Sequence, residues 1–221
     1  MGGVLHAKYM IIDGRDGYLG SQNFDWRSLT HIQELGVRFR NADLAGALAD
    51  VFEMDWALAA GDPSRPAPNA VARAGAFPVR EVIGRDTTEA TLVASPHGWL
   101  PDSSLWDLPR IVRMIDGAHE TVRVQLLTYK STERDGTFFA DLESALLRAA
   151  ARGVDVRLLL SDWCMRPGTI EGLKKLEPIE NLAVKLVTIP PWSEGFVPYA
   201  RVVHAKYMVA NGREAWVGTS N

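Results

Sequence analysis

A twenty-residue stretch occurs twice in this chain, once near each end, and any fold must accommodate both copies. Residues 4–23 read VLHAKYMIIDGRDGYLGSQN, and residues 202–221 read VVHAKYMVANGREAWVGTSN. Without a gap, 10 of the 20 aligned positions are identical. The matched polar positions are His6 with His204, Lys8 with Lys206, Ser21 with Thr219, and Asn23 with Asn221. A strand repeated for packing needs to keep only its apolar positions, so the retained polar residues indicate a shared chemical role.

Each copy is typical of a β-hairpin. Residues 4–12 alternate in a way that places His6 and Lys8 on one face of a strand. A turn at residues 14–17 then leads to a second strand, which can return Asn23 to the side of the histidine and lysine. For one copy alone, the simpler interpretation is a half-buried strand with an exposed histidine and lysine. Two copies with the same spacings favour one site built from both.

The remaining sequence alternates between helical and strand patterns. Apolar spacing predicts helices over residues 42–60, 105–118, 140–151 and 170–176. It predicts strands over residues 31–40, 91–94, 122–129, 154–160 and 182–187. Strands separated by helices of this length predict an α/β fold in which mainly parallel sheets are flanked by helices.

Because the repeat brackets the chain, we predict two pseudo-symmetric halves. Residues 1–60 form the C-terminal part of the first half and residues 79–221 form the second, joined by a linker over residues 61–78 that is rich in Pro, Gly and Ala. A long series of strands and helices precedes His204, whereas nothing equivalent precedes His6. We therefore expect a fragment, with the first half truncated at its N-terminus and the second half truncated after its motif.

The composition is that of an ordinary soluble domain and excludes several protein classes. The chain has 221 residues and a net charge of −3, which provides no global attraction to nucleic acid or to an anionic membrane. A single cysteine, Cys164, excludes an intrachain disulfide. No apolar run reaches membrane-spanning length and no signal peptide is present, so we expect the chain as given to be soluble, with its compartment left open.

The polar residues of the repeat suit the cleavage of a phosphodiester. Two copies supply two imidazoles for attack on phosphorus and for protonation of the leaving oxygen. Their two lysines can stabilise the oxyanion, and no acidic or cysteine cluster suited to a divalent metal accompanies them, so we expect no metal and no other cofactor. Glu34 follows Asn23 by a short distance. It is either a solvated strand residue or the hydrogen-bond acceptor of a catalytic imidazole.

These residues resemble the two HxK(x)4D and GSxN motifs of the phospholipase D superfamily. The longer strings DWRSLTHIQELGV at 25–37 and VPYARVVHAKYMV at 197–209 are most similar to its lysosomal branch, whose members are 5′-exonucleases on single-stranded nucleic acid, and to related poxviral envelope proteins. The resemblance implies two α/β halves packed about a pseudo-twofold axis, with one active site between them.

By motif position, the resemblance also implies roles for individual residues. The implied catalytic residues are His6, Lys8, His204 and Lys206, and the implied phosphate-binding residues are Ser21, Asn23, Thr219 and Asn221. Glu34, a candidate from its position in the sequence alone, would hold one imidazole. The usual assignment of roles in this family implies that His6 is the nucleophile and His204 the acid. The second copy has Asn211 where the first has Asp13, and we expect this position to anchor the hairpin and take no part in the chemistry.

We therefore expect a metal-independent phosphodiesterase that works through a phosphohistidine. Its substrate is either a phospholipid or a single-stranded nucleic acid. Two alternatives remain from the sequence: a phosphatidyl transferase similar to cardiolipin synthase, and a non-catalytic structural relative of the envelope type.

Overall fold

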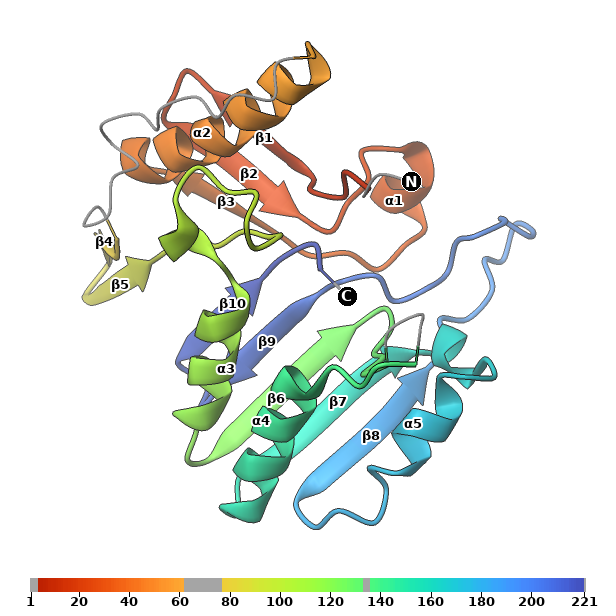
Figure 1. Ribbon diagram of the computed structural model, residues 1–221. Helices are drawn as coiled ribbons and strands as arrows, with labels where there is room; N and C mark the ends of the chain where they lie inside the picture. Colours follow the sequence, from red (N-terminus) through yellow and green to blue (C-terminus); the bar gives the residue numbers. More distant parts are fainter. Residues whose placement is uncertain (1–3, 62–76, 133–135, 221) are drawn as a thin grey trace. The chain divides into compact units, whose positions relative to one another are not determined.

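A computed structural model describes residues 4–61, 77–132 and 136–220 of the chain (Figure 1). These residues form two compact units. Unit 1 contains Met1–Lys8, Leu19–Val37 and Arg110–Asn221, and unit 2 contains Tyr9–Tyr18 and Arg38–Pro109. The predicted division into two halves, at residues 1–60 and 79–221, stays a prediction. Most of the predicted linker lies outside the described residues.

Unit 1 is organised around a five-stranded sheet with the order β10-β9-β6-β7-β8. Its strands are β6 (Thr121–Leu126), β7 (Asp155–Ser161), β8 (Leu182–Val187), β9 (Tyr207–Ala210) and β10 (Glu214–Val217). The pairs β6–β7 and β7–β8 are parallel, whereas β6–β9 and β9–β10 are antiparallel. The α/β class is therefore confirmed, but a mainly parallel sheet is not. The second copy of the repeat enters beside β6 and turns back on itself, which makes the sheet mixed.

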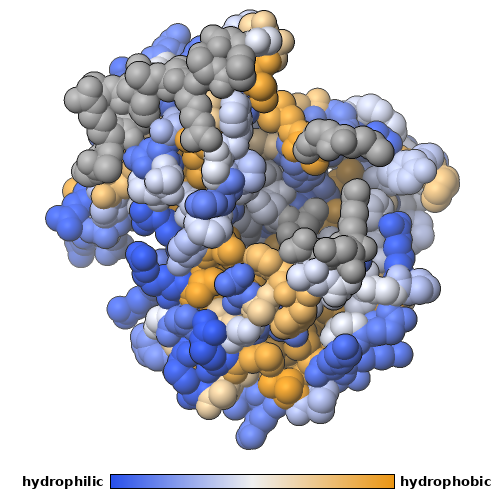
Figure 2. Space-filling model, viewed as in Figure 1, coloured by the Kyte–Doolittle hydropathy of each residue, from blue (hydrophilic) through white to orange (hydrophobic). Residues whose placement is uncertain are grey.

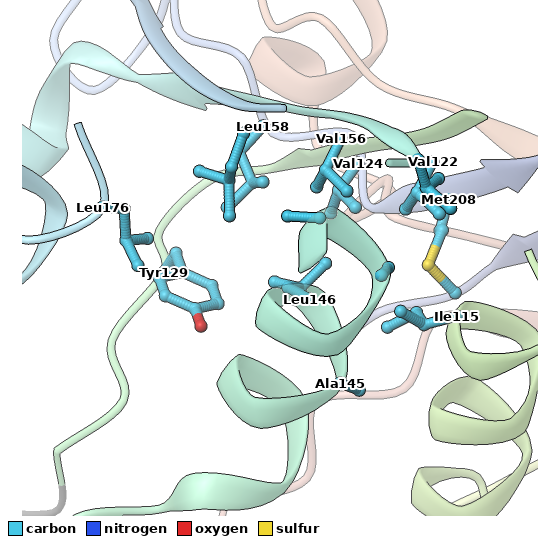
Figure 3. Packing of buried hydrophobic residues seen from close by; sticks show 14 of the residues in the cluster. Ile115, Val122, Val124, Tyr129, Ala145, Leu146, Val156, Leu158, Leu176 and Met208 are labelled. Carbon is cyan, nitrogen blue, oxygen red and sulfur yellow. The ribbon is translucent and has the colours of Figure 1, made fainter. Parts of the chain in front are cut away.

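Helices cover one face of this sheet and bury its centre. The helices of unit 1 are α1 (Trp26–Thr30), α3 (Leu108–Asp116), α4 (Ala140–Ala151) and α5 (Ile170–Lys174), with a 3-10 turn at Asp162–Met165. Figure 3 shows Leu146 of α4 and Ile115 of α3 directed toward the valines and leucines of β6 and β7. Both side chains are at most 1% exposed, and burial of such a side chain contributes about 1.5–3 kcal/mol. This core fixes the sheet edge from which the second motif extends.

Unit 2 contains the long helix α2 (Ala42–Ala59), which matches the predicted helix to within one residue. Asn41 caps it, because its Oδ1 accepts hydrogen bonds from the backbone of Asp43 and Leu44 at 2.9 and 3.0 Å. Figure 2 shows apolar surface near the C-terminal end of this helix, and its exposed apolar side chains include Phe52 and Leu58. That surface explains why the apolar pattern of the helix is wider than its buried face.

A hairpin in unit 2 was not predicted. Strands β4 (Val79–Ile83) and β5 (Asp86–Ala90) pair antiparallel, whereas the strand expected at residues 91–94 is absent from the described chain. The 3-10 helix η2 (Ser103–Leu105) follows. The hairpin carries polar residues on both faces, so it lacks the apolar alternation that marks a half-buried strand.

Both copies of the repeat fold as the same hairpin. The first forms β1 (Tyr9–Ile12) and β2 (Asp16–Gly20), which with β3 (Gly36–Arg40) make a three-stranded sheet of order β1-β2-β3. The second forms β9 and β10. The turns are Asp13-Gly14, with φ of 52° and 63°, and Asn211-Gly212, with φ of 51° and 64°. Two successive positive φ values define a type I′ turn, which Asn-Gly and Asp-Gly favour.

Candidate functional site

The histidine and lysine of each copy lie just before the hairpin strand, in extended backbone outside the ladder. The predicted strand over residues 4–12 therefore begins only at Tyr9. The two lysines have equivalent backbone partners: the Lys8 carbonyl accepts from Gly20 N at 3.0 Å, and the Lys206 carbonyl accepts from Gly218 N at 3.1 Å. These segments, like Glu34, all belong to unit 1. The repeat in sequence is thus a repeat in local geometry.

Lys206 is the most unusual residue of the site. Its side chain is fully buried, and no described residue offers a hydrogen-bond partner to its Nζ. Burial lowers the pKa of Lys206 to about 7, with Glu34 acting to raise it and Lys8 to lower it. A buried ammonium without a partner is costly, so an anion bound beside Lys206 would lower that cost.

Lys8 is the counterpart of Lys206 in the first copy. Its Nζ donates a hydrogen bond to the carbonyl of His6, so the lysine is held against the backbone of its own motif. Burial lowers the pKa of Lys8, and the charge of Glu34 acts in the opposite direction. The two ammonium groups influence one another, which places both in one cationic environment.

His6 experiences charges from both copies of the repeat. Burial lowers the pKa of His6 from its usual 6.5, and the neighbouring Lys8 lowers it further. Lys206 and His204 of the second copy act in the same direction. A hydrogen bond to the backbone of Thr219 opposes these effects in part. His6 is therefore a neutral imidazole at neutral pH, which is the form that can attack an electrophile.

His204 is held by Glu34. Its Nδ1 lies 3.0 and 2.9 Å from the two carboxylate oxygens, and the Glu34 side chain is only 3% exposed. Burial acts to raise the pKa of Glu34, but hydrogen bonds from His204 and Ser21 lower it by more, so the carboxyl is ionised at neutral pH. The predicted contact between Glu34 and one imidazole is thus present. It leaves Nε2 of His204 as the nitrogen available to a substrate.

Residues 33–35 connect the two copies of the repeat. On one side, Ser21 N donates to the Leu35 carbonyl at 3.0 Å, and Leu35 N donates to Ser21 Oγ at 3.1 Å. On the other side, the Gln33 carbonyl accepts from the backbone N–H groups of His204 and Ala205 at 2.8 and 3.0 Å. The hydroxyl of Ser21 is buried and bonded within this connection. Its predicted contact with phosphate stays a prediction.

The other predicted phosphate-binding residues occupy different settings. Asn23 is exposed just after β2, and Thr219 is half-buried with its backbone at His6. Asn221 lies outside the described residues. Asn211 accepts hydrogen bonds at Oδ1 from three backbone N–H groups, those of His119, Glu120 and Thr121 at 3.2, 2.9 and 3.3 Å. The prediction that this position anchors the hairpin is therefore confirmed.

The sequence did not point to Gln33 and Gln125. Gln125 is an amide within β6, is 4% exposed, and donates from Nε2 to Oε1 of Gln33 at 2.7 Å. The available signal was an uncharged polar residue between two apolar residues, Val124 and Leu126, of a strand. Such a residue must find a partner when buried.

Two further features bear on what the site can hold. Across the described ranges, no group of three or more His, Cys, Asp or Glu side chains could ligate a metal ion. Among these same residues, no helix has the length and apolar character needed to cross a membrane.

Comparison with known proteins places the chain in a family. The family model described as "PLD3/4, PLD-like domain" matches residues 1–188. The chain is 35% identical over 238 aligned residues to the mouse protein 5'-3' exonuclease PLD4, covering 100% of this chain and 47% of that protein. It is 32% identical over 236 residues to 5'-3' exonuclease PLD3 of Xenopus laevis, covering 99% of this chain and 48% of that protein. The chain thus spans about half the length of these relatives.

A solved structure shows the same fold at lower identity. Phosphatidylserine synthase of Haemophilus influenzae Rd KW20 matches with a TM-score of 0.54 and 13% identity, over 94% of this chain and 52% of that one. At this identity, the similarity shows the fold alone. The family match and the two relatives confirm the resemblance seen in the motifs: the chain belongs to the PLD3/4 branch of the PLD-like domain family.

Proposed function

We propose that the chain carries the reaction centre of a metal-independent phosphodiesterase that works through a phosphohistidine. The observation that carries the proposal is the fully buried Lys206, whose ammonium lacks a hydrogen-bond partner among the described residues and lies within reach of the charges of both motifs. A phosphodiester anion supplies the missing partner. The family membership supports the same reaction class.

In the first step, a ring nitrogen of His6 attacks the phosphorus. The P–N bond forms while the bond from phosphorus to the leaving oxygen breaks, and Nε2 of His204 donates a proton to that oxygen. The lowered pKa of His6 supports the assignment as nucleophile, because it keeps the ring unprotonated at neutral pH. The carboxylate of Glu34 supports the assignment of His204 as acid, because it stabilises the imidazolium.

In the second step, water replaces His6 on phosphorus. His204, now neutral, accepts a proton from the water, the new P–O bond forms, and the P–N bond breaks. His6 returns to its neutral form and His204 to its protonated form. The reaction therefore consumes one water and needs no other reactant.

The two lysines take the electrostatic role in this scheme. Lys8 and Lys206 stabilise the extra negative charge on the phosphoryl oxygens in the transition state. A low-dielectric environment increases the value of such charges, and Lys206 is fully buried. Binding of the anion also raises the proton affinity of Lys206, which keeps the lysine charged when it is needed.

We propose single-stranded nucleic acid as the substrate class. The support comes from the relatives, which are named as 5'-3' exonucleases. The net charge of −3 indicates that attraction to the nucleic acid is local, through the site lysines. Phospholipid hydrolysis, phosphatidyl transfer and a non-catalytic role are the competing functions.

The test compares the protein with its His204→Ala variant on bis-p-nitrophenyl phosphate. We expect the variant to lose about 10²–10⁴-fold in turnover, which is the range of general acid–base assistance. His119→Ala, at a surface histidine, is the matched control and keeps the full rate. Equal rates for the protein and His204→Ala would overturn the enzymatic function. Release of headgroup from phosphatidylcholine vesicles in preference to cleavage of 5′-labelled single-stranded DNA would overturn the substrate class.

A further inference from the structure

We propose that Gln33, Gln125 and Tyr207, together called the amide bridge, position His204 for proton donation to the leaving group. The three residues lie on three segments of unit 1: the loop before β3, strand β6 and strand β9. The inference rests on the proposed function, because it concerns the acid in that reaction. It assigns to these residues a positioning role, with no contact to the substrate.

The backbone of Gln33 is bonded to the segment that carries His204. Gln33 N donates to the Val202 carbonyl at 3.0 Å, and the Gln33 carbonyl accepts from His204 N at 2.8 Å. Gln33 also pairs with Val203 in an isolated parallel bridge. The next residue along the chain, Glu34, binds the imidazole of His204. Any movement of Gln33 therefore moves the carboxylate relative to the ring that it holds.

The side chain of Gln33 is tied to the central sheet. Its Oε1 accepts from Gln125 Nε2 at 2.7 Å, and Oε1 of Gln125 accepts from the Tyr207 hydroxyl at 2.8 Å. Tyr207 and Gln125 are also register partners across the β6–β9 pair. Because the hydroxyl supplies a donor, the Gln125 amide is oriented with its NH₂ toward Gln33. The bridge thus links the Glu34 loop to β6 and to β9, the strand that begins directly after Lys206.

The location of Gln125 argues for a role beyond packing. It is 4% exposed and lies on the face of β6 opposite to Val122, Val124 and Leu126, which belong to the apolar core. A buried amide stabilises less than an apolar side chain of similar size unless both of its ends are bonded. Here each end has one partner, and both partners lead toward the second motif. A positioning function accounts for a buried amide whose two hydrogen bonds connect it to Gln33 and to Tyr207, on either side of the His204 segment.

The inference predicts a dependence on the leaving group. A misplaced acid slows departure of an alkoxide, which requires a proton, more than departure of p-nitrophenolate, which leaves as an anion. The experiment measures kcat/KM for two thymidine 5′-phosphodiesters, one with p-nitrophenol and one with methanol as leaving group. The quantity compared is kcat/KM for the p-nitrophenyl ester divided by kcat/KM for the methyl ester. This ratio reports the acid alone, because changes in binding or in the amount of folded protein affect both values equally and cancel.

We expect Gln125→Leu and Gln33→Leu to raise this ratio about tenfold or more, since small misplacements of a catalytic group have effects of up to about 10²-fold. Gln33→Glu keeps an oxygen acceptor for Gln125 and restores the ratio. Tyr207→Phe raises it by less, because the amide keeps its bond to Gln33. Tyr129→Phe, which removes a hydroxyl hydrogen bond to Glu143 in the same unit, is the matched control and leaves the ratio unchanged.

The outcomes separate this inference from the proposed function. If His204→Ala keeps the wild-type rate on the methyl ester, the proposed function fails. If His204→Ala is inactive on that ester but both leucine variants keep the wild-type ratio, the amide bridge is only structural and the inference is overturned. Gln33 lies at the surface, so Gln33→Leu provides the measurement even where Gln125→Leu does not fold.

Discussion

Glu34 and His204 are 170 positions apart in sequence, yet a carboxylate oxygen of one lies 2.9 Å from Nδ1 of the other. The carboxylate comes from the segment that follows the first copy of the repeat, and the imidazole belongs to the second copy. The pair therefore joins the two copies through a single charged hydrogen bond. It also makes them unequal, because His6 has a lowered pKa while His204 has a carboxylate partner. Chemical asymmetry thus arises from a nearly symmetric sequence.

Substitution of Glu34 tests this asymmetry. We expect Glu34→Gln to keep one hydrogen bond to His204 but to lose the charge that stabilises the imidazolium, and kcat/KM to fall about 10²–10⁴-fold. The pKa of Glu34 is lowered on folding, so its ionisation stabilises the protein above its unfolded pKa near 4.5 and this contribution is lost as the pH falls through the folded value. The free energies of unfolding of the wild type and of Glu34→Gln, taken from unfolding curves, should therefore converge as the pH falls below 4.5. Glu89→Gln, at an exposed carboxylate, leaves both the rate and the curves unchanged.

Lys206 is predicted to lower the free energy of unfolding although activity requires it. Its pKa is about 7 in the folded protein against 10.5 in the unfolded chain, so the unfolded chain binds more protons between these values. Lys206→Met should abolish activity and raise the free energy of unfolding by roughly 2–5 kcal/mol below pH 7, at about 1.4 kcal/mol per pKa unit. The gain should shrink as the pH rises from 7 and vanish above 10.5. Denaturation in urea at several pH values measures it, with Lys185→Met at an exposed lysine as control; a gain independent of pH would contradict the explanation.

Asn211 is predicted to matter for stability and not for chemistry. Its Oδ1 accepts from three backbone N–H groups, and its φ of 51° is one that asparagine tolerates better than most residues. Asn211→Ala should lower the free energy of unfolding by about 2–3 kcal/mol, because three backbone N–H groups lose their acceptor and alanine is strained at a positive φ. Asn211→Asp keeps the acceptor and should cost less than about 1 kcal/mol. A loss of activity in folded Asn211→Asp would show that this position takes part in the reaction.

Substitution of the glycines that end the two hairpins, Gly20 and Gly218, is predicted to cost different amounts of stability. A Cβ on Gly20 would lie 2.7 Å from the Leu35 carbonyl oxygen and 2.7 Å from Cα of Gly36, whereas the three atoms nearest to a Cβ on Gly218 all belong to the side chain of Trp216. Backbone atoms cannot move away from an added methyl group as readily as a side chain can. Gly20→Ala should therefore cost about 1–3 kcal/mol and also lower kcat, since it displaces the residue next to Glu34, whereas Gly218→Ala should cost less. Thermal unfolding and initial rates measured on both variants check this order.

The sequence predicted those parts of the fold in which side-chain pattern and burial agree. The helix over residues 140–151 and the strand over 182–187 have the predicted bounds, because their apolar positions face the core. The strand expected over residues 4–12 begins only at Tyr9. Alternation in the sequence shows which side chains share a face of an extended segment. Where a strand begins depends on whether its backbone groups have hydrogen-bond partners in a neighbouring strand. In the second copy, the backbone N–H of His204 bonds to Gln33, outside the hairpin.

The site was predictable to the extent that it is repeated. His6, Lys8, His204 and Lys206 stand out because their spacing recurs, and Glu34 because of its distance from the first motif. Gln33 and Gln125 have no counterpart that repetition reveals. Their importance depends on a hydrogen bond between residues 92 positions apart, which only the folded chain shows. The full burial of Lys206 could not be predicted either, because Lys206 and Lys8 occupy the same position in the two copies of the repeat.

The most direct test of the account is to trap the covalent intermediate. The protein, His204→Ala and His6→Ala are each mixed with bis-p-nitrophenyl phosphate, quenched in alkali and analysed by peptide mass spectrometry. We predict a p-nitrophenylphosphoryl group on His6, formed with release of one p-nitrophenolate. It is transient in the wild type, accumulates in His204→Ala because water is no longer activated, and is absent from inactive His6→Ala. Turnover by His6→Ala at the wild-type rate, or a phosphoryl group on any residue other than His6, would contradict the account.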